Sequence, residues 1–352
     1  MSIILELIES KKHFDGVNLV ERMDECRTPA ISIAIIEKYE ICETYVHGVK
    51  QRGKEEKVTE DTLFQAASIS KPVFAVAVMR LMERGIFDID MDISDYLSGY
   101  AVPTFDNQKH NITLRQILSH HAGLNLRGFA GYQQEQEIPT IEQILAGVFP
   151  SNHLKLKLMK KPGTEFMYSG GGYVLAQKIM TDTCKLDFND LMYDLVLSPF
   201  FMTHSNFSQP LSKEKINTAA FGYDIHNLQL PGGFNIMPEL SAAGLWTTPL
   251  DLARFGIEIM KALKGENKLL DKNTADLLIT KAYENSPYGL GFEVEESKKG
   301  LIFGHNGSNI GYKSRMLFCP NDGSGIVMMQ NSDIGWNILN EVINAFKDIY
   351  SW

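Results

Sequence analysis

The spacing of apolar residues changes twice along this chain, and those changes limit how it can fold. Strand-like runs occupy residues 30–48 and recur from about 285 to 330. Between them, from about 70 to 280, apolar residues recur mainly at helical spacing, with long irregular connections. Helical patterns also occupy 3–24, with an interruption near Gly16, and the final segment 335–350. We therefore expect an α+β fold, in which both chain ends build one antiparallel sheet with the terminal helices on one face.

The length of 352 residues is compatible with one large domain or two lobes. The chain contains no internal repeat and no low-complexity linker. We predict a single domain, 1–352, with a sheet lobe at about 1–70 plus 286–352. An inserted, mainly helical lobe at about 71–285 is expected to pack against the free face of the sheet.

The charge balance and the chain start exclude several classes of partner. A formal net charge of -9 argues against nucleic acid or an anionic membrane surface. No apolar stretch approaches the length of a membrane span. The first residues lack a basic segment and carry Glu6 and Glu9 within their apolar run, which is unlike a secretory signal. If Met1 is the native start, we expect a cytoplasmic protein; no oligomeric state is predicted.

One short segment, FQAASISKP, places Ser68 and Lys71 three positions apart where a strand-like run gives way to a helix. An ordinary explanation is a serine helix cap followed by a lysine that extends to solvent. A second S-x-x-K string, Ser212 to Lys215, lies in a charged stretch and is interpreted as solvated surface. The string at Ser68 and Lys71 differs because its neighbours in the sequence are apolar, so Lys71 has few polar residues beside it.

Two other segments could complete a nucleophilic site. PGTEFMYSGGGY places Tyr168 before a glycine triplet that opens a helix, and GLIFGHNGSNIGY places His305 and Gly307 at a strand end, followed by Ser308. Each could equally be a plain turn. Two further matches, Tyr283 in a Y-x-N string and His121 in an H-x-G string, are rejected because of their context.

Several familiar site motifs are absent from the sequence. It contains no G-x-S-x-G, G-x-G-x-x-G, P-loop or H-E-x-x-H string, and its four cysteines have no metal-binding or paired spacing. The usual hydrolase, dinucleotide, nucleotide and zinc-protease interpretations are therefore removed. We expect neither a metal nor an organic cofactor.

Six segments occur in an order that resembles the serine β-lactamase-like family. They are FQAASISK, ITLRQILSHHAGL, PGTEFMYSGGGY, AAGLWTTPLDLARF, YGLGF and FGHNGSNIGY, spread over about residues 60–315. That family includes class C β-lactamases, penicillin-binding D,D-peptidases, D-aminopeptidases and family VIII esterases. The resemblance implies a sheet with a helical lobe and a site between the two.

The resemblance also implies roles for individual residues. Ser68 would be the acylated nucleophile, and Lys71 and Tyr168 the pair that handles protons. His305 and Gly307 would form a strand wall beside the substrate. The oxyanion donors would be the backbone amides of Ser68 and Ser308.

The chemistry of such a pair requires perturbed side chains. Lysine and tyrosine both have ordinary pKa values near 10, so neither is a competent base at neutral pH unless its environment changes it. We expect burial beside a helix N-terminus to lower the pKa of Lys71, and its charge to lower the pKa of Tyr168. Which of the two accepts the proton stays open, because they act as a coupled pair.

Two departures from the family pattern affect the expected substrate. Gly170 stands where the family often has the asparagine of Y-x-N, whose amide would touch the lysine and the substrate carbonyl. His305 stands where class C β-lactamases have lysine, and a largely neutral histidine is a weaker anchor for a carboxylate. Both changes weigh against efficient β-lactam hydrolysis.

The preferred function is therefore a serine hydrolase that cleaves an ester or amide of a small molecule or short peptide through an acyl-enzyme. Esterase or small-peptide hydrolase activity ranks first. The alternatives are β-lactamase or penicillin-binding activity, and a catalytically silent binding or scaffold protein. Aromatic and apolar loop residues could form a pocket rim or could simply pack on their neighbours; these are Phe129, Tyr132, Phe234 and Met237.

Overall fold

The two ends of the chain meet in one six-stranded antiparallel sheet of order β2-β1-β8-β7-β6-β5. The computed structural model describes residues 3–9, 11–97 and 99–352. The strands are β1 Ala30–Glu37, β2 Glu40–Gly48, β5 Glu293–Ser297, β6 Gly300–Asn309, β7 Tyr312–Cys319 and β8 Ser324–Gln330. Pairing of β1 with β8 joins the N-terminal hairpin to the C-terminal strands. The expected α+β fold with a sheet from both chain ends is confirmed.

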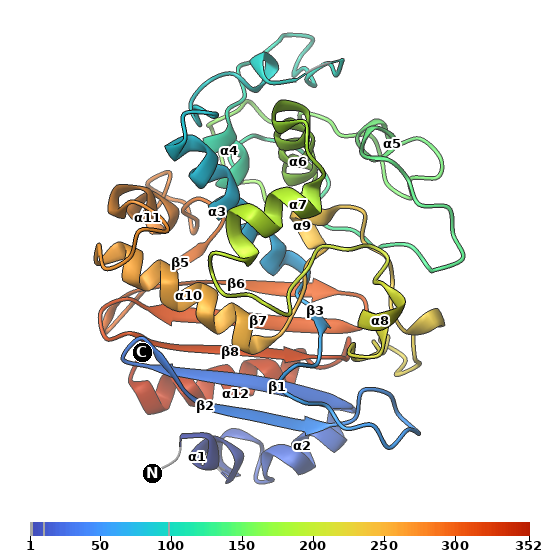
Figure 1. Cartoon of the computed structure of the whole chain (residues 1–352), viewed down its shortest axis with the longest axis vertical. Helices are drawn as coiled ribbons and strands as arrows, with labels where there is room; N and C mark the ends of the chain where they lie inside the picture. The colour runs from blue at the N-terminus through green and yellow to red at the C-terminus, as the bar shows by residue number, and fades with distance from the viewer. Residues whose placement is uncertain (1–2, 10, 98) are drawn as a thin grey trace.

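Alternating side chains of the strands form two separate cores. In β1, Ile31, Ile33 and Ile35 pack with the terminal helices, whereas Ala34 and Ile36 belong to the larger core on the opposite face. The terminal helices are α1 Ile3–Glu9, α2 Leu19–Glu25 and α12 Trp336–Tyr350. On the opposite face α10, Pro249–Leu263, crosses the strands (Figure 1). The predicted terminal-helix face is thus present.

The middle of the chain forms a mainly helical part above one edge of the sheet (Figure 1). Its helices are α3 Ser70–Glu83, α4 Leu114–Leu118, α5 Ile141–Ala146, α6 Gly170–Cys184, α7 Phe188–Met192, α8 Lys213–Ile216, α9 Leu240–Ala243 and α11 Lys272–Ile279. A two-stranded ribbon pairs β3 Phe64–Gln65 with β4 Trp246–Thr247. Among the described residues, no helix is both long and apolar enough to cross a membrane.

Helix α3 is largely buried, as is α6. Every residue from 70 to 79 is buried, so the helix lacks the polar face of a surface helix. It begins beside the sheet and runs into the helical part (Figure 1). Its first turn therefore lies where the two parts of the fold meet.

Candidate active site

Ser68 lies in a one-turn 3₁₀ helix, Ala67–Ile69, between β3 and α3. Ala67 has a φ of +50°, a conformation that is uncommon for a residue with a side chain and that often marks functional turns. The N-cap of α3 is Ile69, and no side chain caps that helix. The Ser68 hydroxyl is therefore not a helix cap, and it is free for other contacts.

Strand β6 packs directly against this turn. A Cβ on Gly307 would lie 2.1 Å from both the Ala66 carbonyl oxygen and the Ser314 Oγ, which only glycine avoids. The Ser314 hydroxyl donates to the same Ala66 carbonyl at 2.9 Å. On the other side, Ser70 Oγ donates to the Ala67 carbonyl at 2.6 Å. The nucleophile turn is thus fixed against the strand from two directions.

Lys71 is 1% exposed and lies in the first turn of α3. Its Nζ is 3.0 Å from Ser68 Oγ and donates to the Ala242 carbonyl of α9 at 2.8 Å. Burial lowers the pKa of Lys71 to about 7, because the charged form loses its hydration. A neutral amine whose N–H is held by Ala242 can direct its lone pair to the serine hydroxyl.

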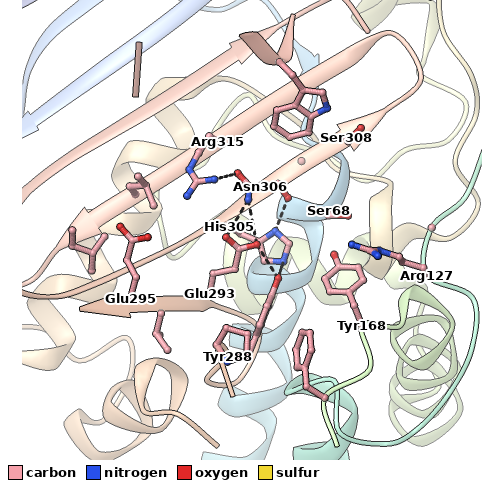
Figure 2. A pocket seen from close by; sticks show the side chains of 18 residues that line it. Ser68, Arg127, Tyr168, Tyr288, Glu293, Glu295, His305, Asn306, Ser308 and Arg315 are labelled. Carbon is pink, nitrogen blue, oxygen red and sulfur yellow. Dashed lines mark hydrogen bonds between the residues drawn. The ribbon is translucent and has the colours of Figure 1, made fainter. Parts of the chain in front are cut away.

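Tyr168 closes the other side of the serine (Figure 2). The Lys71 Nζ lies 5.1 Å from the centre of its ring. Burial raises the pKa of Tyr168, and its hydrogen bond to Ser68 acts in the opposite direction with smaller effect. Our expectation that a lysine cation would lower this pKa is therefore wrong, because desolvation dominates and the lysine itself loses its charge near pH 7.

His120 holds the segment that carries Tyr168. The Ser169 amide donates to His120 Nδ1 at 3.0 Å, and the Met167 amide donates to the His120 carbonyl at 2.7 Å. The histidine ring also lies 4.1 Å from the Tyr168 ring, centre to centre. Burial lowers the pKa of His120 well below its usual value, so the ring is neutral with its proton on Nε2. His120 thus contacts Tyr168 and both of its neighbours.

His305 lies on the sheet side of the site and is 1% exposed. Burial lowers the pKa of His305 to about 4, so it is uncharged at neutral pH. Its Nε2 lies 3.4 Å from the Tyr288 hydroxyl, and this hydroxyl donates to Glu293 Oε1 at 2.9 Å. His305 therefore contributes shape and hydrogen bonding, and no positive charge, to the wall of the site.

Ser68, Tyr168, Tyr288 and His305 line one cavity of about 750 Å³. Figure 2 shows Ser68, Tyr168 and His305 around its centre, with Arg127 at one end and Arg315 toward the other. Its walls are Ser68, Arg127, Gly128, Phe166, Tyr168, Pro287, Tyr288, Glu293, Val294, Glu295, Ile302, His305, Asn306, Gly307, Ser308, Arg315, Leu317 and Trp336. Strand β5 pairs with β6 only from Gly300 to Gly304, so within the described chain the rest of that edge, up to Asn309, is free of a second strand.

Gly170 lies at the start of α6 and does not line this cavity. The Phe129 ring occupies the space beside it, where a Cβ on Gly170 would lie 2.7 Å from a ring carbon. A side chain at this position would therefore have to displace Phe129. The site contact that the family pattern places at position 170 stays a prediction.

The other loop residues that could have formed a rim are packed inside the protein. Tyr132, Phe234 and Met237 are at most 2% exposed, and neither these three nor Phe129 lines the cavity. The loops pack on each other, for example through the pairing of Tyr132 with Ile236. The rim interpretation is therefore wrong, and packing explains these side chains.

The motif matches that were rejected from the sequence, namely the second S-x-x-K string and the strings at Tyr283 and His121, lie outside the cavity. Ser212 caps the short helix α8 by accepting from the Lys215 amide, which is the ordinary role of serine in S-x-x-K. Tyr283 stacks on His121 with ring centres 3.9 Å apart. Neither Ser212 nor Tyr283 is therefore placed to act on Ser68.

Several polar or charged residues of the cavity were not proposed as site residues from the sequence, among them Arg127, Tyr288, Glu293, Asn306 and Arg315. Asn306 could most easily have been predicted from the sequence, because it lies between His305 and Gly307 in the strand motif. Glu293 and Arg315 come from β5 and β7, and strand register places them near Asn306, whereas Arg127 and Tyr288 come from two loops. Among the described residues, no group of three or more His, Cys, Asp or Glu side chains is arranged to hold a metal ion.

The fold and the cavity together define a class: the structure is that of the serine β-lactamase and transpeptidase fold. A model of the beta-lactamase family matches residues 18–337. The chain therefore belongs to the beta-lactamase family of serine hydrolases.

Two curated relatives in sequence are distant. Protein flp of Staphylococcus aureus strain N315 is 24% identical over 336 residues, which cover 92% of this chain and 63% of that protein. Penicillin-binding protein 4* of Bacillus subtilis strain 168 is 22% identical over 321 residues, covering 86% and 68%. The chain thus spans less than two thirds of the length of the staphylococcal relative.

Solved structures of similar proteins share the fold. An octameric penicillin-binding protein homologue from Pyrococcus abyssi superposes with a TM-score of 0.78 at 22% identity, covering 94% of this chain and 76% of that one. D-amino acid amidase from Ochrobactrum anthropi SV3, complexed with L-phenylalanine, has a TM-score of 0.74 at 20% identity, covering 97% and 99%.

A variant of His120 tests whether it positions Tyr168. We expect His120→Ala to lower kcat for an activated ester by about tenfold to a hundredfold, since a misplacement of about 1 Å has effects of this size. KM should change little. His120→Asn should retain more activity, because its amide oxygen can accept from Ser169 and asparagine tolerates the φ of +61° at this position. Equal kcat values for the alanine and asparagine variants would contradict a positioning role.

Proposed function

We propose that this protein is a serine hydrolase that cleaves an ester or amide bond through an acyl-enzyme on Ser68. The observation that carries the proposal is the amine of Lys71, buried and 3.0 Å from the Ser68 hydroxyl. A buried lysine whose pKa falls to about 7 is a base at neutral pH. A protein that only binds a ligand has no need for this arrangement, which costs stability.

The pKa directions of Lys71 and Tyr168 support one proton path. Neutral Lys71 accepts the proton of Ser68 as the hydroxyl oxygen attacks the substrate carbonyl. Tyr168 stays protonated at neutral pH, and its hydroxyl donates a proton to the departing alcohol or amine. The lysine ammonium then returns a proton to Tyr168, which restores both groups. In the second half-reaction water takes the place of Ser68 and releases the acid.

The remaining parts of the site suit the acyl group. The free edge of β6 beyond Gly304 offers backbone groups beside Ser68. The amides of Ser68 and Ser308 are the proposed donors to the oxyanion, and both residues line the cavity. His305, neutral and bonded to its surroundings, forms the wall between them and Tyr288.

An ester or a small peptide is the preferred substrate. The neutral His305 offers no charge for a β-lactam carboxylate, and Phe129 fills the space beside Gly170. Among the relatives, the D-amino acid amidase is an amide hydrolase that matches nearly the full length of both chains. Hydrolysis of β-lactams is the second candidate, supported by the family membership.

Two measurements test this function. Incubation with a fluorophosphonate or with a penicillin, followed by intact mass spectrometry and peptide mapping, should show one adduct on Ser68. Rates on p-nitrophenyl esters, D-amino acid amides and nitrocefin should rank esters or amides above the β-lactam. Absence of an adduct with every acylating probe would refute the enzyme and favour the catalytically silent alternative.

The pH dependence of acylation should report the titration of Lys71. Below its pKa of about 7 the ammonium cannot accept the serine proton, and above it the amine can. We expect the acylation rate with a neutral ester to rise with pH, through one apparent pKa near 7, and then to level off. Stopped-flow measurements between pH 5 and pH 9 check this. A rate that falls over this range, or rises only near pH 10, would contradict the assignment.

A further inference from the structure

Residues 143–164 form a basic segment in an otherwise acidic protein. They include no aspartate or glutamate, whereas the whole chain has 43 acidic residues against 34 Lys and Arg. The segment carries four exposed lysines, which are Lys155, Lys157, Lys160 and Lys161. Lys160 pairs with Glu165 at 3.1 Å. Within the described chain, no carboxylate lies within ion-pair distance of the other three lysines, so their charges are not neutralised locally.

The same segment carries the two most exposed large apolar side chains among the described residues. Phe149 is 83% exposed and Leu154 is 77% exposed. The chain turns back on itself here, because a Cβ on Gly147 would lie 2.2 Å from the Lys155 amide nitrogen. The apolar side chains and the first lysines therefore share one surface. We call residues 148–161 the lysine loop.

The backbone of the lysine loop is held in place by the core and by one side chain. Leu156 and Leu158 are buried, so Lys155 and Lys157, which alternate with them, point outward. The Asn125 side chain accepts from the Lys157 amide at 2.7 Å and donates to the Lys155 carbonyl at 3.1 Å. The cations thus project from a fixed backbone.

The carboxylates that border the basic segment are already paired. Glu142, on α5, accepts from the Lys178 ammonium at 2.9 Å, and Glu165 pairs with Lys160. Figure 1 shows α5 and the loops around it at the outer side of the helical part. The lysine loop can therefore reach a large partner without interference from these two carboxylates.

An anionic bilayer surface matches both properties of the lysine loop. Apolar side chains enter the boundary between head groups and acyl chains, and lysines are attracted to anionic head groups. An exposed apolar side chain can enter a bilayer without a preformed pocket, whereas a protein partner would have to supply one. We propose that the lysine loop binds the surface of a membrane that contains anionic lipids, with Phe149 and Leu154 entering the head-group region.

This contact is local, because the net charge of -9 argues against a general attraction of the protein to anionic surfaces. It also has a direction. Asn125, which holds the lysine loop, lies two residues before Arg127 of the cavity wall. Docking would therefore bring one end of the Ser68 cavity near the membrane. The inference goes beyond the proposed hydrolase and does not depend on it.

Sedimentation of the full chain with vesicles tests the inference. The probes are vesicles of phosphatidylcholine with about one third phosphatidylglycerol, compared with vesicles of phosphatidylcholine alone. At low ionic strength we expect the partition coefficient to be at least about tenfold higher for the anionic vesicles, since each lysine near such a surface contributes a factor of about five. Added salt should reduce the difference by screening.

Two double variants separate the electrostatic and apolar contributions. Lys155→Gln/Lys157→Gln should lower partition onto the anionic vesicles by about tenfold to thirtyfold, through the loss of two charges. Phe149→Gln/Leu154→Gln should lower it by about tenfold or more, through the loss of the inserting groups. All four side chains are exposed, so the melting temperature should not change.

Matched controls remove the same kinds of group elsewhere. Lys11→Gln/Lys12→Gln deletes two exposed lysines between α1 and α2, at the far end of the molecule from α5 (Figure 1). Leu186→Gln/Tyr193→Gln deletes two apolar side chains that flank α7 and are 56% and 58% exposed. Both controls should bind the anionic vesicles as the unsubstituted protein does.

Equal partition onto the two kinds of vesicle would overturn the inference, as would unchanged partition in either lysine-loop variant or an equal loss in a control. Self-association of the protein through Phe149 and Leu154, without vesicle binding, would also overturn it and would assign the loop to contact between two copies. None of these measurements uses turnover. Failure of the proposed hydrolase, seen as absence of an adduct on Ser68, would leave their outcome unaffected.

Discussion

Replacement of Ser68 by alanine is expected to reduce ester hydrolysis by at least about a thousandfold, as for other serine nucleophiles. The residue caps no helix, and Lys71 keeps its bond to the Ala242 carbonyl, so the fold should be preserved. The kcat/KM for a p-nitrophenyl ester measures the loss. Circular dichroism and the melting temperature measure whether the protein is folded.

Ser212→Ala is the matched control, because it removes the serine of the second S-x-x-K string. It deletes the cap of a four-residue surface helix, so any effect should be a small change in stability with no change in kcat/KM. If both serine variants hydrolyse esters at the unsubstituted rate, the nucleophile has been placed wrongly.

Lys71 and Tyr168 should behave as one unit in kinetic measurements. Lys71→Met keeps the bulk of the side chain and removes the amine, and Tyr168→Phe removes one hydroxyl. Each is expected to lower kcat by about a hundredfold or more, the usual range for a positioned acid or base. Because the proton passes through both groups, the double variant should be about as slow as the worse single variant.

Tyr283→Phe is the control for this pair. Tyr283 lies outside the cavity, and its ring stacking on His121 does not need the hydroxyl. Full activity is expected. Losses at 71 and 168 that multiply in the double variant would show that the two groups act independently, and a large loss at 283 would point to a different tyrosine.

Most of the architecture could be predicted from apolar spacing. The change from strand-like to helical period and back places the strands at both chain ends, and β8 is buried along its whole length, as its continuous apolar run predicts. The start of α10 could also be predicted from its local sequence. Thr248 caps the helix by accepting from the Asp251 amide, and Pro249 takes the first helical position between them. These features depend on residues close together in the sequence.

The site was less predictable, because its contacts join distant residues. The motifs single out Ser68, Lys71 and Tyr168, and the structure brings them together. However, the Lys71 amine is oriented by a carbonyl 171 residues away, which no local pattern indicates. The hydrogen bonds that link Glu293, Asn306 and Arg315 depend on the register of three strands. Sequence alone also gave the wrong direction for the pKa of Tyr168, since burial is set by the whole fold.

The burial of Lys71 has a consequence for selection experiments. Below its folded-state pKa of about 7 the lysine is charged in both the folded and the unfolded chain, and the folded state loses the hydration of that charge. This penalty is fully present below pH 7 and disappears as the pH rises through the ordinary lysine value near 10. A library screened for heat resistance at neutral or acidic pH would therefore enrich apolar replacements of Lys71. Evolution toward greater robustness, without a demand for activity, would therefore favour loss of the reactive amine.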